Sequence, residues 1–74
     1  MDATHDTAAL LAHAGWVRGL ARALVHDAGE ADDLTQETFV RALESGPRDS
    51  SAWRAWLGRV LRNTHAERQR ASAR

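Results

Sequence analysis

Residues 30–43 read EADDLTQETFVRAL, and apolar or small residues recur in this stretch at the three- and four-residue steps of an α-helix. At about 100° per residue, one side of the helix collects Ala31, Leu34, Thr38 and Ala42, with Thr35 and Phe39 at its edge. The opposite side collects Asp33, Gln36, Glu37, Val40 and Glu44. The first side predicts a core contact. On the second side, polar residues surround the apolar Val40. This fits a protein-binding patch, or Val40 is simply one of the single exposed valines that are common on protein surfaces.

Both ends of this helix carry sequence signals. Asp27 can cap its N-terminus, and Glu30 stands at the spacing of a capping box. Gly46 and Pro47 end the helix, and Asp49 or Ser50 can cap the helix that follows. The middle helix is therefore bounded on both sides.

Two further stretches have the same periodicity. The first begins near Thr7 and carries one apolar stripe, which comprises Leu10, Ala14, Val17, Leu20, Ala21 and Leu24. The last covers residues 52–70, and its apolar side comprises Trp53, Trp56, Leu57, Val60 and Thr64. We predict an all-α fold, a compact bundle of three main helices, in which the outer two pack around Leu34, Phe39 and Leu43 of the middle helix.

The composition limits what such a chain can do. At 74 residues it forms a single domain, with an ordered core expected over residues 7–70, and a core of that size rarely contributes more than ~3 to 5 kcal/mol. There is no cysteine, and the four histidines lack metal-ligand spacing, so we expect no metal and no other cofactor. No apolar run reaches the ~20 residues that span a bilayer, and the first residues are acidic where a signal peptide is basic. These features predict a cytoplasmic protein without a membrane partner.

An enzyme is the least favoured class of function. The acidic cluster of Asp32, Asp33 and Glu37 is expected on a helix exterior, beside no plausible nucleophile. His65 and Glu67 stand two residues apart on one helix, a spacing at which side chains do not face each other. We therefore expect no catalytic residues.

The charges divide between the two parts of the chain. Residues 1–47 carry three arginines against eight carboxylates, a net charge of −5, whereas residues 48–74 carry seven arginines against two carboxylates, a net charge of +5. The side of the last helix that is opposite its apolar side comprises Arg59, Arg62, Asn63, Ala66, Gln69 and Arg70. Arginine, asparagine and glutamine contact phosphates and nucleobase edges. The alternative is an equally common solvated face, in a lysine-free chain that gains solubility from its charges.

Two segments together resemble a known family. They are LARALVHDAGEADDLTQETFVRAL, residues 20–43, and AWRAWLGRVLRN, residues 52–63. In this combination and at this separation they are similar to region 2 of bacterial RNA polymerase sigma factors, especially the small extracytoplasmic-function (ECF) type. The similarity extends over residues 10–70. It implies a non-enzymatic domain that binds RNA polymerase core and promoter DNA and directs transcription initiation.

The resemblance assigns roles to individual residues. In the family, the helix with the DL-x-QE motif docks on the clamp coiled coil of the polymerase β′ subunit, which implies polymerase contacts by Asp33, Gln36, Glu37 and Val40. The basic helix and the loop before it hold the non-template strand of the minus-ten element. This implies DNA contacts by Arg54, Arg59, Arg62, Asn63 and Arg70. The loop that would capture a flipped base comprises Ser45, Gly46, Pro47, Arg48, Asp49, Ser50 and Ser51.

The sequence departs from the family pattern in two respects. The position after RAWL is often aromatic in relatives and is Gly58 here, so that stacking surface is missing from the helix. We also expect no C-terminal sigma region 4 in this chain, since it ends at Arg74. The alternative function is therefore a free-standing protein-interaction module, held by an anti-sigma factor or competing for polymerase without opening promoters. Binding of single-stranded promoter DNA would distinguish the two functions.

Overall fold

The computed structural model describes residues 8, 10–47 and 50–73 of the chain. Its helices are α2 (Ala14–Leu24), α3 (Ala28–Ser45) and α4 (Trp53–Ala73), and a short 3-10 turn, η1 (Ser50–Ala52), leads directly into α4. Residues 10–12 are also helical and precede α2. The described residues contain no strand. The predicted all-α fold with three main helices is confirmed.

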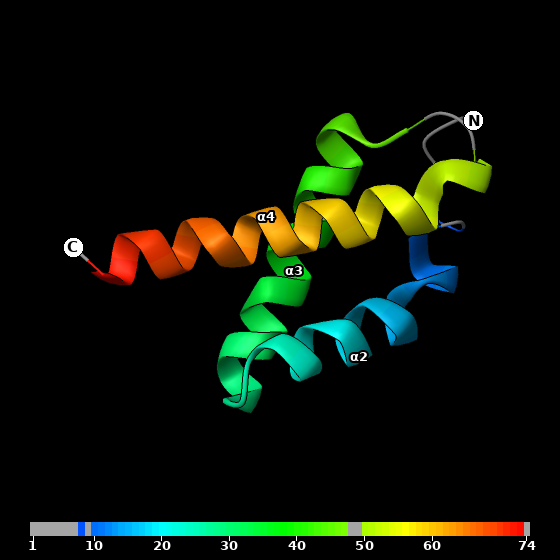
Figure 1. Ribbon diagram of the computed structural model, residues 1–74. Helices are drawn as coiled ribbons and strands as arrows, with labels where there is room; N and C mark the ends of the chain where they lie inside the picture. Colours follow the sequence, from blue (N-terminus) through cyan, green and yellow to red (C-terminus); the bar gives the residue numbers. More distant parts are fainter. Residues whose placement is uncertain (1–7, 9, 48–49, 74) are drawn as a thin grey trace.

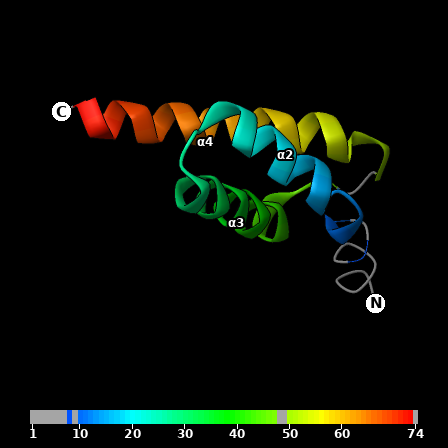
Figure 2. The same ribbon diagram turned by 90° about the horizontal axis from the view of Figure 1, so that it is seen from below.

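The three helices form two layers. α2 and α4 run side by side in one layer, and α3 crosses them in the other (Figures 1 and 2). Each of the three helices contacts the other two. The C-terminal part of α4 extends past the crossing with α3, so its last turns project from the bundle (Figure 1).

The core lies where the two layers meet. Its buried apolar members are Leu10, Val17, Ala21, Ala31, Leu34, Ala42, Trp53, Leu57 and Leu61. The predicted apolar sides of all three helices thus face inward, although Leu61 was not among the residues expected there. Trp56 is only partly buried and packs against this core, with its ring edge-on to that of Trp53.

Two threonines of the core side of α3 are buried without leaving a polar group unpaired. The hydroxyl of Thr35 donates to the carbonyl of Ala31, and the hydroxyl of Thr38 donates to that of Leu34, both at 2.8 Å. Because each bond stays within the helix, α3 can bury these side chains without a partner from another helix.

The prediction that Leu43 belongs to the core is wrong. Its side chain is 62% exposed, whereas Phe39 is partly buried against the core. The physical reason is helical geometry, since the core-facing row of α3 ends at Ala42 and the next residue is turned by about 100° away from it. Leu43 therefore lies three residues from Val40, on the outward side of α3.

The first helical stretch is interrupted where the sequence predicted one continuous helix. His13 forms a turn with φ −100° and ψ 1°, and α2 begins after it at Ala14. No side-chain hydrogen bond caps this start. The predicted cap Thr7 lies outside the described residues.

The predicted boundaries of α3 are confirmed at both ends. A side-chain oxygen of Asp27 accepts a 2.9 Å hydrogen bond from the amide of Glu30, which caps the N-terminus. Gly46 follows the last residue of α3, and its amide donates to the carbonyl of Ala42 at 2.9 Å. A Cβ atom at residue 46 would lie 2.6 Å from Cη2 of Trp53 and 2.5 Å from that carbonyl oxygen. The turn out of α3 therefore requires glycine, because the buried tryptophan of α4 packs directly on its backbone.

We predict that Gly46→Ala lowers the free energy of unfolding by ~1 to 3 kcal/mol, the usual cost of forcing an extra group into a packed core. Thermal and urea denaturation followed by circular dichroism would measure the change. Gly19→Ala is the matched control, because Gly19 is exposed in α2 and a Cβ there meets nothing within 4 Å. This control should gain about 1 kcal/mol from helix propensity. Equal destabilisation by the two variants would contradict the packing of Trp53 on Gly46.

Candidate functional site

The outward side of α3 presents apolar and polar side chains together. We call it the α3 outer face and define it as Asp33, Gln36, Val40, Leu43 and Glu44. The side chains of Val40 and Leu43 are 52% and 62% exposed, and the three polar residues are exposed as well. Among the described residues, no hydrogen bond or ion pair engages Asp33 or Gln36. The polar groups of Asp33 and Gln36 are therefore available to a partner, next to the exposed side chains of Val40 and Leu43.

Glu37 differs from the rest of the predicted polymerase-binding set because it lies at the border between α3 and α4. Its Oε1 accepts from Nη2 of Arg68 at 2.6 Å and from Nε of Arg68 at 3.3 Å. Its Oε2 accepts from Arg41 at 3.0 Å, and Arg41 also donates to Glu67 at 3.0 Å. We call these four residues, Glu37, Arg41, Glu67 and Arg68, the α3–α4 ion network. Glu37 thus ties the two helices together, which the sequence pattern did not indicate.

The ion network changes the acidity of its members. The hydrogen bond from Arg68, supported by the charges of Arg68 and Arg41, lowers the pKa of Glu37 below its ordinary value of 4.5 against an opposing contribution from partial burial. The hydrogen bond to Glu67 raises the pKa of Arg41. Both shifts favour the charged forms that the network joins.

Most of the predicted DNA-binding residues share one exposed side of α4. Arg59, Arg62, Asn63 and Arg70 are all exposed and stand at helical spacing along it. No ion pair within the described part of the chain neutralises these arginines. Arg70 stands in the last turn of α4. This side is a row of free guanidinium groups with one amide among them.

Arg54 does not lie with the other predicted DNA-binding residues. It is exposed at the start of α4, and its guanidinium carbon is 4.8 Å from the ring centre of Trp16 on α2. The guanidinium of Arg54 therefore lies over a ring of α2, apart from the row formed by the other four residues.

The predicted base-capturing loop is described only in part. Ser45 is the last residue of α3, and its hydroxyl donates to the carbonyl of Arg41 at 3.3 Å. Gly46 and Pro47 follow, both half-buried, and Ser50 and Ser51 belong to η1. Arg48 and Asp49 lie outside the described residues. Of this loop, the position of Gly46 is fixed by its contact with Trp53.

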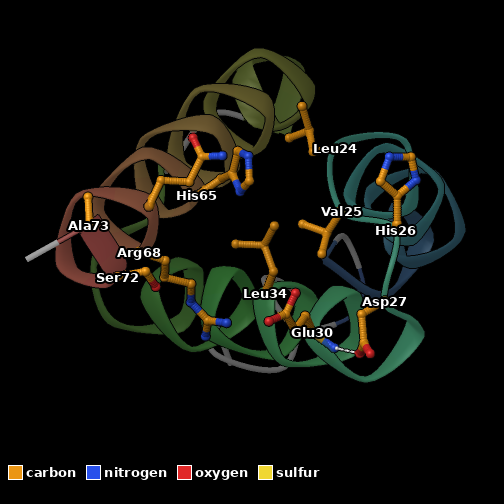
Figure 3. Close-up of a pocket in the computed structure, with 11 residues that line it drawn as sticks. Leu24, Val25, His26, Asp27, Glu30, Leu34, His65, Arg68, Ser72 and Ala73 are labelled. Carbon is orange, nitrogen blue, oxygen red and sulfur yellow. Dashed lines mark hydrogen bonds between the residues drawn. The ribbon is translucent and has the colours of Figure 1, made fainter.

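A groove of about 640 Å³ lies between the end of α2, the start of α3 and the C-terminal half of α4. Leu24, Val25 and Leu34 point toward its centre, and charged or polar side chains surround them (Figure 3). None of the predicted site residues lines this groove. The predicted contacts are instead on convex helix surfaces, which suit macromolecular partners better than a small molecule.

Two kinds of feature are absent from the described residues. No group of histidine, cysteine and acidic side chains there is arranged to hold a metal ion. None of the helices found there has the length and apolar character needed to cross a membrane.

The ion network predicts a pH dependence of stability. Because the pKa of Glu37 is lower in the folded chain, its contribution is fully present above pH 4.5 and is lost as the pH falls through the folded value. We expect the difference in unfolding free energy between the parent and Glu37→Gln to be constant near neutral pH and to shrink in acid. Urea denaturation over a pH series would measure it.

The effect is expected to be small, since the side chain of Glu37 is 35% exposed and solvent screens its charges. Glu44→Gln is the control, because it removes an exposed carboxylate of the same helix. Identical pH profiles for the parent and Glu37→Gln would show that the ion pairs of Glu37 contribute nothing to folding, since the Arg41–Glu67 pair is present in both.

Known proteins are similar to this chain over most of its length. The family model for Sigma-70 region 2 matches residues 10–74. The probable RNA polymerase sigma-C factor of Mycobacterium bovis is 49% identical over 47 residues, which cover 61% of this chain and 25% of that protein. The ECF RNA polymerase sigma factor SigC of Mycobacterium tuberculosis has the same identity and coverage. The chain therefore spans a quarter of the length of these curated relatives. No solved structure gives a significant match.

The matched region contains all three helices and both of the surfaces described above. The two segments that carry the resemblance, residues 20–43 and 52–63, lie within it. An all-α domain with this match over nearly its whole length belongs to the Sigma-70 region 2 family, and its similarity to the SigC proteins supports the ECF type.

Proposed function

We propose that this domain binds RNA polymerase through the α3 outer face and promoter DNA through α4, and in this way helps to direct transcription initiation. The observation that carries the proposal is the composition of the α3 outer face. Two large apolar side chains remain more than half exposed there, beside Asp33 and Gln36, whose polar groups no described residue engages. Exposed apolar groups rimmed by free polar ones are typical of a protein-binding surface.

The partner proposed for the α3 outer face is the clamp coiled coil of the polymerase β′ subunit. A coiled coil that offers basic side chains would receive charge-assisted hydrogen bonds from Asp33 and a further hydrogen bond from Gln36. Val40 and Leu43 would form the desolvated centre of the contact. Leu43 is an addition to the set expected from the sequence, and its exposure is the reason for including it.

Glu37 has a smaller share in this proposal than the sequence suggested. Both of its carboxylate oxygens already accept hydrogen bonds, one from Arg68 and the other from Arg41. A partner would have to share or displace these donors. Asp33 and Gln36 are therefore the better candidates for direct polymerase contacts.

The proposed DNA contact uses the exposed side of α4. Arg59, Arg62 and Arg70 would neutralise phosphates of the non-template strand at the minus-ten element, because no carboxylate within the described residues competes for them. Asn63 lies between them and can read a base edge. The loop after α3 would hold a flipped base, next to the Gly46–Trp53 contact. Binding and positioning suffice for this function, and no covalent step is required of the domain.

We predict that the double variant Val40→Ala/Leu43→Ala binds the isolated β′ clamp coiled coil about tenfold or more weakly than the parent, because central apolar contacts dominate such interfaces. Asp33→Asn/Gln36→Ala should weaken binding as well. Isothermal titration calorimetry would measure both. Leu11→Ala is the matched control, since Leu11 is 67% exposed and lies outside the α3 outer face.

Both double variants should melt like the parent, since none of the four side chains is buried. If the parent is folded and does not bind the clamp, or if all variants bind equally well, the proposed polymerase surface is wrong.

We also predict that Arg59→Ala and Arg62→Ala each weaken binding of single-stranded DNA and reduce its salt dependence. Losing one phosphate contact should lower the slope of log K against log salt by about 0.7. Fluorescence anisotropy with a labelled, A/T-rich single strand would measure this over a salt series. Arg22→Ala removes one exposed arginine from α2 and is the control for net charge. Clamp binding without any DNA binding would favour the alternative, a protein-interaction module.

A further inference from the structure

Trp16 of α2 contacts α4 next to the arginines that we propose to bind phosphates, and the proposed function gives this tryptophan no role. Its ring lies under the guanidinium of Arg54, 4.8 Å from centroid to carbon. The tip of the same ring is 3.4 Å from the position that a Cβ of residue 58 would occupy. The indole thus lies across α4 at Gly58, and a side chain larger than alanine at that position would displace it.

Arg54, Gly58 and Arg62 follow one another at four-residue steps along the side of α4 that Trp16 covers. A Cβ at residue 58 would also lie 3.6 Å from Nη1 of Arg62. The guanidinium of Arg54 therefore lies over the Trp16 ring, and Arg62 lies beyond it, next to Gly58. Both arginines are exposed, and neither has an acidic partner within the described residues.

A purely structural role accounts for only part of this arrangement. Trp16 is partly buried and packs against the core, which explains its apolar contacts. Core packing does not require an exposed arginine without an acidic partner over the ring. An aliphatic side chain at residue 54 would cover the ring equally well. Arginine planes and aromatic rings together are the groups on which proteins stack unpaired bases, and a neighbouring arginine can hold the adjoining phosphate.

We propose that Trp16 and Arg54 form a stacking platform for one unpaired nucleobase of single-stranded DNA. The base contacts the outer side of the Arg54 guanidinium, which the indole holds in place from below by a cation–π interaction. Arg62 binds the phosphate next to that base. The inference rests on the proposed DNA-binding function and extends it, because it brings α2 into a surface otherwise assigned to α4 alone.

The test uses three variants that separate the ring from its packing and the guanidinium plane from its charge. Trp16→Leu keeps an apolar contact with the core and removes the ring, Trp16→Phe keeps a ring, and Arg54→Lys keeps the charge. Loss of a stacked base should weaken binding of the A/T-rich single strand about fivefold or more. We expect this loss in Trp16→Leu and Arg54→Lys, with the salt slope of the parent, and partial rescue in Trp16→Phe.

Strands that carry a single abasic site at successive positions provide a second readout. At one position, the parent should bind the abasic strand more weakly than the intact strand. Trp16→Leu should bind these two strands equally well, because the variant has no platform on which that base could stack. A merely structural role of Trp16 would weaken all strands by the same factor and would leave the position-specific loss intact, which would overturn the proposal. Arg54→Lys gives the same comparison if Trp16→Leu fails to fold.

The same variants separate the stacking platform from DNA binding as such. If Arg59→Ala and Arg62→Ala weaken binding and reduce the salt slope, while Trp16→Leu and Arg54→Lys bind as the parent does, the platform is wrong and the DNA-binding function stands. If the folded parent binds no single-stranded DNA, both are overturned.

Discussion

The three helices pack together only because α2 and α4 can approach α3 closely. On the core side of α3, Ala31, Thr38 and Ala42 are at most 4% exposed, and Leu34 is the one large side chain that is fully buried there. Small side chains let the neighbouring helices lie against the α3 backbone, and the hydroxyl of Thr38 is satisfied within the helix. Since α2 and α4 both pack against one side of α3, no helix packs against its other side in the described part of the chain. The α3 outer face is therefore free to hold apolar groups that a partner, and not the core, would cover.

The electrostatic contacts between α3 and α4 divide the acidic residues of α3 into two groups. Glu37 is held by Arg68 and Arg41, and this network joins the helix proposed to bind polymerase to the helix proposed to bind DNA. Asp33 stands about one turn earlier and Gln36 directly before Glu37, and neither has such a partner among the described residues. The DL-x-QE motif therefore contains residues with two different roles. Glu37 holds α3 against α4, whereas Asp33 and Gln36 can bind a partner.

Sequence reasoning succeeded where the relevant interaction is local. The cap at Asp27, the end of α3 at Gly46 and the inward rows of all three helices depend on spacing within a few residues, and all were predicted. It failed for Leu43, one position beyond the core row, and it missed Leu61. The contacts of Glu37 with Arg68 and of Trp16 with Arg54 join residues from different helices. Helical periodicity cannot predict contacts between residues of different helices, because these contacts depend on how whole helices are placed relative to one another.

The placement of Trp16 links binding to stability. α2 contains two exposed glycines, Gly15 and Gly19, and no side-chain hydrogen bond caps its start, so its intrinsic helical preference is low. Tertiary contacts must hold it, and these are the buried Val17 and Ala21 together with the indole that lies across α4. A ligand that binds the Trp16–Arg54 pair only in the folded arrangement would stabilise the packing of α2 on α4 by mass action. In so small a domain, where a core rarely contributes more than ~3 to 5 kcal/mol, even a weak contact of that kind is a large part of the total stability.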